Sequence, residues 1–157
     1  MSLVNVINFI SYFLNYFKIR IKFKSRYRNT IRMNLLTNTL RNLDAEFSKI
    51  DSYWSPRIVG EINQSYLKIA KLKGDFFWHK HENEDELFII QKGALELEFE
   101  DKTVQMNKGD FFVVPKGVMH RPHAKEECWV ILMELKETLH TGTENYEQTK
   151  SIEEQLK

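Results

Sequence analysis

The first regular pattern of hydrophobic and polar positions in the chain has the period of an α-helix. Between residues 34 and 50, large apolar side chains recur at intervals of three and four residues. Side chains with this spacing lie on one face of a helix. The pattern therefore predicts an amphipathic helix over residues 34–50, and the Pro-containing run at 53–56 predicts its end. The apolar positions are Leu36, Leu40, Leu43, Phe47 and Ile50.

After residue 56 the pattern changes to the period of two that is typical of β-strands. It is clearest in residues 94–100, where apolar side chains alternate with three glutamates. Glycine-containing turn signals separate the segments, and the absence of a helical pattern between them argues against a parallel βαβ sheet. The pattern predicts an all-β fold, either an antiparallel sandwich or a barrel. The predicted strands are residues 66–72, 86–91, 94–100, 103–106, 111–114 and 128–135.

The N-terminal region differs in composition from the rest of the chain. Residues 1–17 are uncharged and rich in large apolar side chains, and residues 1–43 hold eight Lys/Arg and no acid. Residues 44–157 hold the other 15 Lys/Arg and all 22 Asp/Glu, so their net charge is −7. The net charge of +1 for the whole chain therefore combines a basic N-terminal region with an acidic remainder. The apolar run is short for a transmembrane helix, which needs about 20 residues. Its basic residues follow the run, whereas in a secretory signal they precede it.

Three interpretations of this leader remain open. Apolar bulk beside Lys/Arg suits an anchor on a membrane surface, and the basic residues also suit an arm that binds nucleic acid. We favour a third interpretation, in which the leader lies outside the functional protein and translation starts at Met33, because the leader shares no patterning with the rest. The expected organisation is a leader at 1–32, a helix at 33–52, a β-domain at 53–140 and a polar tail at 141–157 that frays or lies on the surface.

The composition excludes several classes of protein. A single cysteine rules out an intramolecular disulfide framework and a Cys-based zinc finger. That residue, Cys128, lies in an apolar predicted strand, where we expect a small buried side chain rather than a nucleophile. Six glycines and three prolines exclude collagen-like and Pro/Gly-rich disordered classes.

The histidines are the clearest candidates for chemistry. His79 and His81 are two residues apart, so on a strand both imidazoles project from one face. Glu86 opens the next predicted strand, and His120 follows a Pro-Lys-Gly turn. Three imidazoles and one carboxylate suit a divalent first-row transition metal ion: Mn, Fe, Ni, Zn or Cu. Taken alone, however, two histidines on a strand face also fit an ordinary surface position.

Two longer segments resemble the motifs of the cupin superfamily. Residues 74–93 (GDFFWHKHENEDELFIIQKG) are similar to the first cupin motif, and residues 109–120 (GDFFVVPKGVMH) are similar to the second. The resemblance covers about residues 66–135, and 33–145 as a whole resembles the small single-domain cupins of bacteria. Two positions depart from the usual pattern: the spacer from Gly74 to the first histidine is one residue short, and Ala124 stands where an asparagine often closes the second motif.

The resemblance implies an antiparallel jelly-roll barrel that binds one metal ion through His79, His81, Glu86 and His120, with a metal-free degenerate cupin as the alternative. In such a barrel the strands that carry the ligands would also present Phe77, Phe88 and Ile90 to a dry interior. Small cupins of this kind usually pair through sheet edges, so the resemblance also implies a homodimer.

Several residues outside the predicted metal site also have expected positions or roles. His123 is interpreted as a histidine in a turn at the rim, and a catalytic acid or base is the alternative role for it. Arg121 either holds an acidic substrate group or is a surface charge. His140, beyond the last strand, is expected to be solvent-exposed, and Trp78 to face away from the ligands. Three lysines are expected to form an exposed strand edge: Lys68, Lys71 and Lys73.

Two functions from different classes follow from the resemblance. The first is a metal-dependent enzyme acting on a small organic molecule, as an isomerase or a dioxygenase would. The second is a module that binds or senses a small ligand without turning it over. The sequence shows no Gly-rich phosphate loop and no helix-turn-helix pattern. We therefore expect a cytoplasmic protein whose partner is a small molecule, not nucleic acid, and not a membrane unless the leader is part of it.

Overall fold

The computed structural model describes residues 36–142, 146 and 149–156. The chain divides into residues 1–39 and residues 40–157, and the second unit is the one described below. Within the described residues no helix is both long enough and apolar enough to cross a membrane. The predictions for the leader at 1–32 lie outside the described residues.

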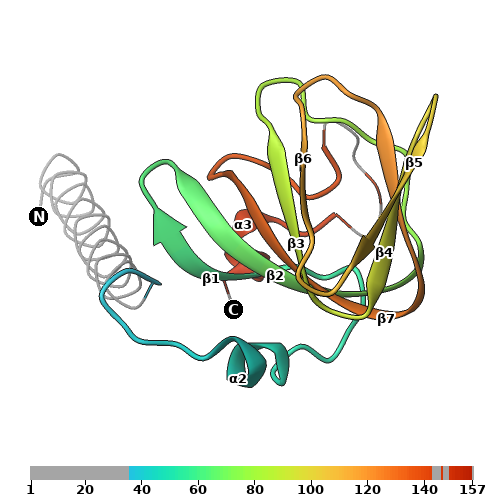
Figure 1. The fold of residues 1–157 in the computed structure, drawn as a ribbon. Coiled ribbons are helices and arrows are strands. Elements are labelled where there is room, and N and C mark those ends of the chain that lie inside the picture. The colour runs from blue at the N-terminus through green and yellow to red at the C-terminus, as the bar shows by residue number, and fades with distance from the viewer. Residues whose placement is uncertain (1–35, 143–145, 147–148, 157) are drawn as a thin grey trace, which may run out of the picture. The chain divides into compact units, whose positions relative to one another are not determined.

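The second unit is an antiparallel β-fold of seven strands that curl around one interior (Figure 1). The predicted all-β jelly-roll barrel with a short helix near its N-terminal end is confirmed. The strands are β1 (Arg57–Ile62), β2 (Ser65–Asp75), β3 (Glu86–Lys92), β4 (Ala94–Phe99), β5 (Thr103–Asn107), β6 (Phe111–Val114) and β7 (His120–Leu135).

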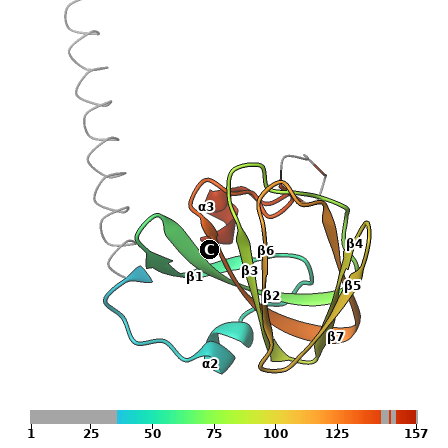
Figure 2. The same cartoon turned by 45° about the horizontal axis from the view of Figure 1, so that its top comes forward.

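The long strand β7 connects the two parts of the sheet. It pairs with β2 over residues 123–135, with β3 over residues 129–133 and with β4 over residues 120–123. β1 extends the sheet beyond β2, β6 extends it beyond β3, and β5 pairs with β4 (Figure 2). The first residue of β7, His120, also forms an isolated antiparallel bridge with His79, in the segment between β2 and β3.

The interior is filled by alternate side chains of these strands. The strict alternation of β4 places Leu95, Leu97 and Phe99 inside. The sharp turn between β3 and β4 requires Gly93, whose φ is +79° and whose added Cβ would lie 2.6 Å from the Glu127 carbonyl oxygen. The interior core is thus specified by a period-two pattern that is visible in the sequence.

A second, smaller core lies on the outer face of the sheet, where the short helix α2 (Leu43–Phe47) packs. Phe47 is fully buried there and stacks on Trp129 with ring centroids 4.8 Å apart. The predicted helix over 34–50 is too long, because residues 37–42 are not helical and Leu40 is fully exposed. The Asn42 side chain accepts a hydrogen bond from the Ala45 N–H, and this N-cap starts the helix late.

Strand β1 was not among the predicted strands. Its residues do not alternate between buried and exposed, because the register shifts between Ile58 and Gly60 where it pairs with β2. Such an irregularity removes the period-two signal on which a sequence-based prediction depends.

The described residues after 140 pack against the barrel. Thr141 and Gln155 are buried, and Ser151 and Glu154 form a capping box at the start of the short helix α3 (Ile152–Gln155). Tyr146 stacks on Phe77 with ring centroids 4.1 Å apart. These contacts, together with the hydrogen bond from the Tyr146 hydroxyl to the Trp78 carbonyl, hold this part of the segment against the barrel, while Ser151 and Glu153 lie on the surface as expected.

Candidate metal centre

The structure brings the four predicted metal ligands together. His79 and His81 lie in the segment between β2 and β3, Glu86 opens β3, and His120 opens β7. All four side chains are buried, and one ligand atom from each lies within 4.8 Å of the others. The backbones of His79 and His120 exchange two N–H···O hydrogen bonds of 3.0 Å, which places their rings 4.3 Å apart.

Each imidazole is oriented by a contact at its Nδ1 atom. Nδ1 of His79 donates to the Phe77 carbonyl at 2.9 Å, and Nδ1 of His120 donates to the Val118 carbonyl at 3.0 Å. Nδ1 of His81 lies 3.5 Å from a Glu84 carboxylate oxygen. A proton on Nδ1 leaves the Nε2 lone pair for a metal ion, and metal-binding histidines are commonly oriented in this way.

The Nε2 atoms of two of these rings face the same carboxylate oxygen. Nε2 of His120 and Nε2 of His81 each lie 3.2 Å from Oε2 of Glu86. Nε2 of His81 has no hydrogen-bond partner of acceptable geometry, although it is fully buried. Lone pairs that face a carboxylate in a buried site need a proton or a cation between them, so this donor set fits a divalent metal ion.

The pKa values reflect competition between burial and mutual attraction. Burial lowers the pKa of His79 to about 4. Burial also lowers the pKa of His81, but the Glu86 carboxylate outweighs it, and the net direction is upward. Burial raises the pKa of Glu86, yet the His120 and His81 side chains that face the carboxylate dominate and hold it well below its usual range. A carboxylate that stays ionised beside a neutral imidazole is a combination that metal binding requires.

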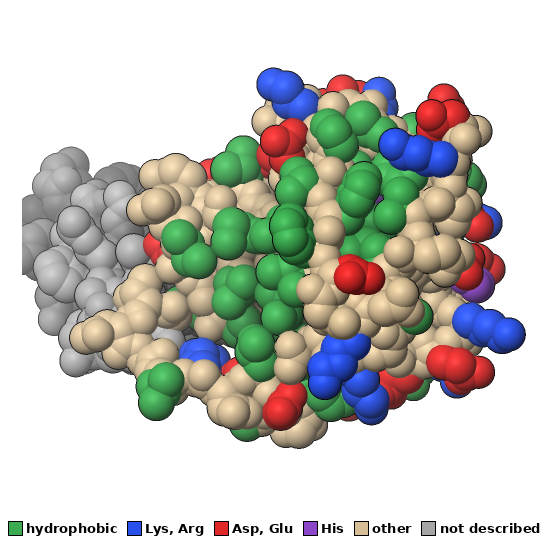
Figure 3. Space-filling model, in the orientation of Figure 1, with side chains coloured by type: hydrophobic (Ala, Val, Ile, Leu, Met, Phe, Trp, Pro, Cys, Tyr) green, Lys and Arg blue, Asp and Glu red, His purple; other side chains and the backbone are tan. Residues whose placement is uncertain are grey.

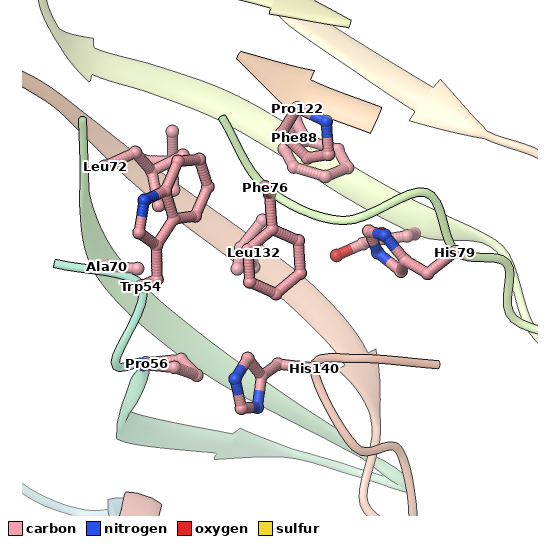
Figure 4. Close-up of a pocket in the computed structure, with 12 residues that line it drawn as sticks. Trp54, Pro56, Ala70, Leu72, Phe76, His79, Phe88, Pro122, Leu132 and His140 are labelled. Atoms are coloured by element: carbon pink, nitrogen blue, oxygen red, sulfur yellow. The ribbon is translucent and has the colours of Figure 1, made fainter. Parts of the chain in front are cut away.

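A narrow, mainly apolar cavity leads to this cluster (Figure 4). The cavity has a volume of about 30 Å³ and lies within a space of about 370 Å³ that includes the part open to solvent. His79 and Glu86 belong both to the lining and to the cluster. The other lining residues are Trp54, Pro56, Ala70, Leu72, Phe76, Phe88, Pro122, Val130, Leu132 and His140.

Phe76, rather than the predicted Phe77, faces this cavity, whereas Phe88 and Ile90 are buried as predicted. The N–H of Phe76 donates to the Pro122 carbonyl and that of His79 to the His120 carbonyl. Because these two anchored positions are three residues apart, the alternation shifts by one residue between them. Phe77 consequently turns to the outside and meets Tyr146.

Two polar residues that were expected on the surface are buried. His140 is 7% exposed and lines the cavity, because the chain turns back after β7 and returns over the barrel. Lys68 is fully buried, because β2 is an inner strand flanked by β1 and β7. It shares the inward face of β2 with Ala70 and Leu72, and that parity was a signal in the sequence. Lys73 is exposed as expected.

His123 lies away from the metal ligands. It is partly exposed, and its Nδ1 is 2.8 Å from an Asp75 carboxylate oxygen. Along β7, His120 and Pro122 are buried, and the partly exposed Arg121 and His123 alternate with them on the outer face. Arg121 pairs with Glu98 and lies over the ring of the exposed Trp78. Cys128 is buried, as expected, and burial raises its pKa to about 12.

Comparison with known proteins agrees with this fold. Residues 68–133 match the family model of the cupin domain. A cupin-2 domain containing protein from Shewanella frigidimarina is 40% identical; its solved structure superposes with a TM-score of 0.60 over 61% of this chain and 94% of that one. The chain belongs to the cupin family. The cupin is also 32% identical to protein YdbB of Bacillus subtilis over 83 residues, which are 52% of this chain and 74% of YdbB.

Further solved structures resemble this cupin. Protein NMB1881 from Neisseria meningitidis is 32% identical, with a TM-score of 0.58 over 62% of this chain and 99% of its own. Hydroquinone 1,2-dioxygenase from Sphingomonas is 15% identical, with a TM-score of 0.55 over 62% of this chain and 32% of that enzyme. At that identity the likeness concerns the fold alone.

Proposed function

We propose that this cupin is a metal-dependent enzyme acting on a small, largely apolar organic molecule. One observation carries the proposal: three imidazoles and a carboxylate converge in a buried cluster at a wall of an apolar cavity. A molecule in that cavity would lie beside His79 and Glu86, which belong to both. An ion held there by His79, His81, Glu86 and His120 would supply Lewis-acid or oxygen-activating chemistry.

The chain's own residues would hold the ion, select the substrate and exclude water. The Nδ1 contacts of His79 and His120 keep their Nε2 atoms directed at the ion, and Glu86 contributes the negative charge. The aromatic and aliphatic walls would exclude bulk water, which strengthens electrostatic interactions inside the cavity.

The charge of the cavity favours a dioxygenase-like reaction over an isomerase acting on a phosphorylated sugar. No Lys or Arg belongs to the described residues that line the cavity. Lys68 lies nearby in the barrel but is already paired with Glu134. Phosphate groups are bound mainly by cationic side chains and helix N-termini, so a phosphorylated sugar would lack its partners here.

Metal analysis of purified protein tests the first half of the proposal. We expect about one first-row ion per chain, lost in His120→Ala. His123→Ala is the matched control, because it removes a partly exposed histidine of the same strand that faces away from the cluster. A wild type that contains no ion after growth with Mn, Fe, Ni and Zn would contradict the metal site.

Oxygen consumption tests the second half. The metal-loaded protein is screened with small diketones, phenols and thiols, and we expect metal-dependent oxygen uptake with at least one of them. If the protein binds metal and a small molecule but turns none over, the alternative of a binding or sensing cupin is supported instead.

We also propose that the cupin forms a homodimer through the outer face of β3 and β6. Phe111 is 70% exposed and Val113 is 45% exposed. The register places them in line with Ile89 and Leu87, and Leu87 is in line with Met133 of β7. Figure 3 shows hydrophobic side chains gathered across this face. A sheet face with several neighbouring exposed apolar side chains supports pairing with a second copy of the chain.

A further inference from the structure

His140 is a buried imidazole that lacks hydrogen bonds. It is 7% exposed, and neither Nδ1 nor Nε2 has a hydrogen-bond partner among the residues that the structure describes. Buried polar atoms in native proteins are nearly always paired, because an unpaired one loses its hydration without replacement. A buried imidazole with two unpaired nitrogens is therefore unusual, and its presence calls for an explanation.

The position of His140 supplies that reason, because it faces the cavity. Its ring centroid lies 6.0 Å from that of Phe76, and the centroid of Phe76 lies 5.3 Å from that of His79. On its other side Phe76 stacks on Trp54 at 4.8 Å. Figure 4 shows His140 and His79 on different sides of Phe76. A molecule against this aromatic wall would have the metal ligands beside one part and His140 beside another.

The segment that carries His140 is held firmly in place. Nζ of Lys68 donates to the Thr138 carbonyl at 3.1 Å and also pairs with Glu134. Two residues after His140, Gly142 has a φ of +65°, and its Cα approaches the Lys80 backbone so closely that a Cβ would collide with the Lys80 carbonyl oxygen. The backbone is thus anchored on both sides of His140, and this anchoring keeps the residue at the cavity wall.

The protonation state defines what His140 can bind. Burial lowers the pKa of His140 to about 4, so the imidazole is neutral at pH 7. A neutral imidazole has one N–H donor and one lone-pair acceptor. A hydroxyl group is complementary, because it also both donates and accepts.

We propose that His140 binds the hydroxyl group of a small, planar, largely apolar ligand whose ring lies against Phe76 and Trp54. A one-ring hydroxy compound is the simplest member of this class. The inference rests on the proposed function only for the statement that this ligand is a substrate.

The test compares phenol with toluene, which has a methyl group in place of the hydroxyl. Binding of each to metal-free protein is measured by calorimetry, in the wild type, in His140→Phe and in His140→Gln. We expect the ratio of the two Kd values to change about tenfold in His140→Phe, which corresponds to one net hydrogen bond. His140→Gln, which retains a donor and an acceptor, is expected to recover part of the preference for phenol.

A second measurement on the wild type avoids any effect of the substitutions on folding. The imidazole ¹⁵N signals of His140 are expected to move when phenol binds and to stay in place with toluene. Two results would overturn the inference: phenol binding that leaves both the signals and the His140→Phe ratio unchanged, or binding of neither compound. Because these experiments use metal-free protein, their outcome is independent of metal content and oxygen uptake, which test the proposed function.

Discussion

Nζ of Lys68 lies 2.5 Å from Oε2 of Glu134 inside the barrel, and neither side chain has any exposed surface. The two residues come from neighbouring strands, since Lys68 is on β2 and Glu134 is on β7. Burial raises the pKa of Glu134 to about 7 even though the Lys68 ammonium lowers it. The same ammonium donates to the Thr138 carbonyl, so the pair links the barrel to the segment that carries His140.

Removing one partner of this pair should destabilise the protein strongly. Lys68→Met leaves a buried carboxylate without its counter-charge, and we expect a loss of about 3 kcal/mol in the free energy of unfolding. Urea unfolding measures this loss. The double variant Lys68→Met/Glu134→Leu should recover most of it, because an apolar pair carries no uncompensated charge. A double variant no more stable than the single one would contradict this explanation.

Acid should destabilise the fold through His140. Burial lowers its pKa from 6.5 to about 4; Lys68, Lys150 and His81 lower it as well, and Glu86 opposes them. Between these two pH values the unfolded chain binds a proton that the folded chain does not, so stability falls as the pH drops.

We expect His140 to account for a loss of about 2 kcal/mol between pH 7 and pH 5. His140→Phe should lack that part of the loss while keeping the part due to His79. Urea unfolding at the two pH values measures it, and equal losses in both proteins would refute the assignment to His140.

Cys128 should be unreactive in the folded protein. Its side chain is buried and its pKa is raised to about 12, so almost no thiolate forms at pH 8. We expect a thiol reagent such as DTNB to label the native protein only as fast as it unfolds, and to label the urea-unfolded chain at once. Rapid labelling in native buffer would show that this strand opens without global unfolding.

A charge on the outer face of β6 should prevent dimer formation. Phe111→Lys places an ammonium on the apolar face that we propose as the interface, and we expect a monomer by size-exclusion chromatography with light scattering. Leu40→Lys is the control, because Leu40 is fully exposed but lies outside β3 and β6. A wild type that is already monomeric would disprove the proposed interface.

The cluster of three histidines and one glutamate could be predicted because its signal is local. The spacing of His79 and His81 places both rings on one face, and the cupin motifs supply Glu86 and His120. The strands β3 to β6 could also be predicted, because short apolar or alternating segments are separated there by turn signals. Strand β1 was not, because a register shift at Ile58 and Gly60 removes the alternation.

Period-two alternation and turn signals are local properties of the sequence, so they predict an antiparallel all-β fold. The resemblance to the cupin motifs implied the jelly-roll barrel and the cluster of His79, His81, Glu86 and His120. The surroundings of a side chain depend on contacts between segments far apart in sequence. Lys68 meets Thr138 across 70 positions, and His140 enters the cavity only because the chain folds back after β7. Packing free energy between distant segments selects these contacts, and no local pattern encodes it. Tertiary structure therefore decided the partners of Lys68 and the position of His140, inside a barrel that the resemblance to the cupin motifs had already implied.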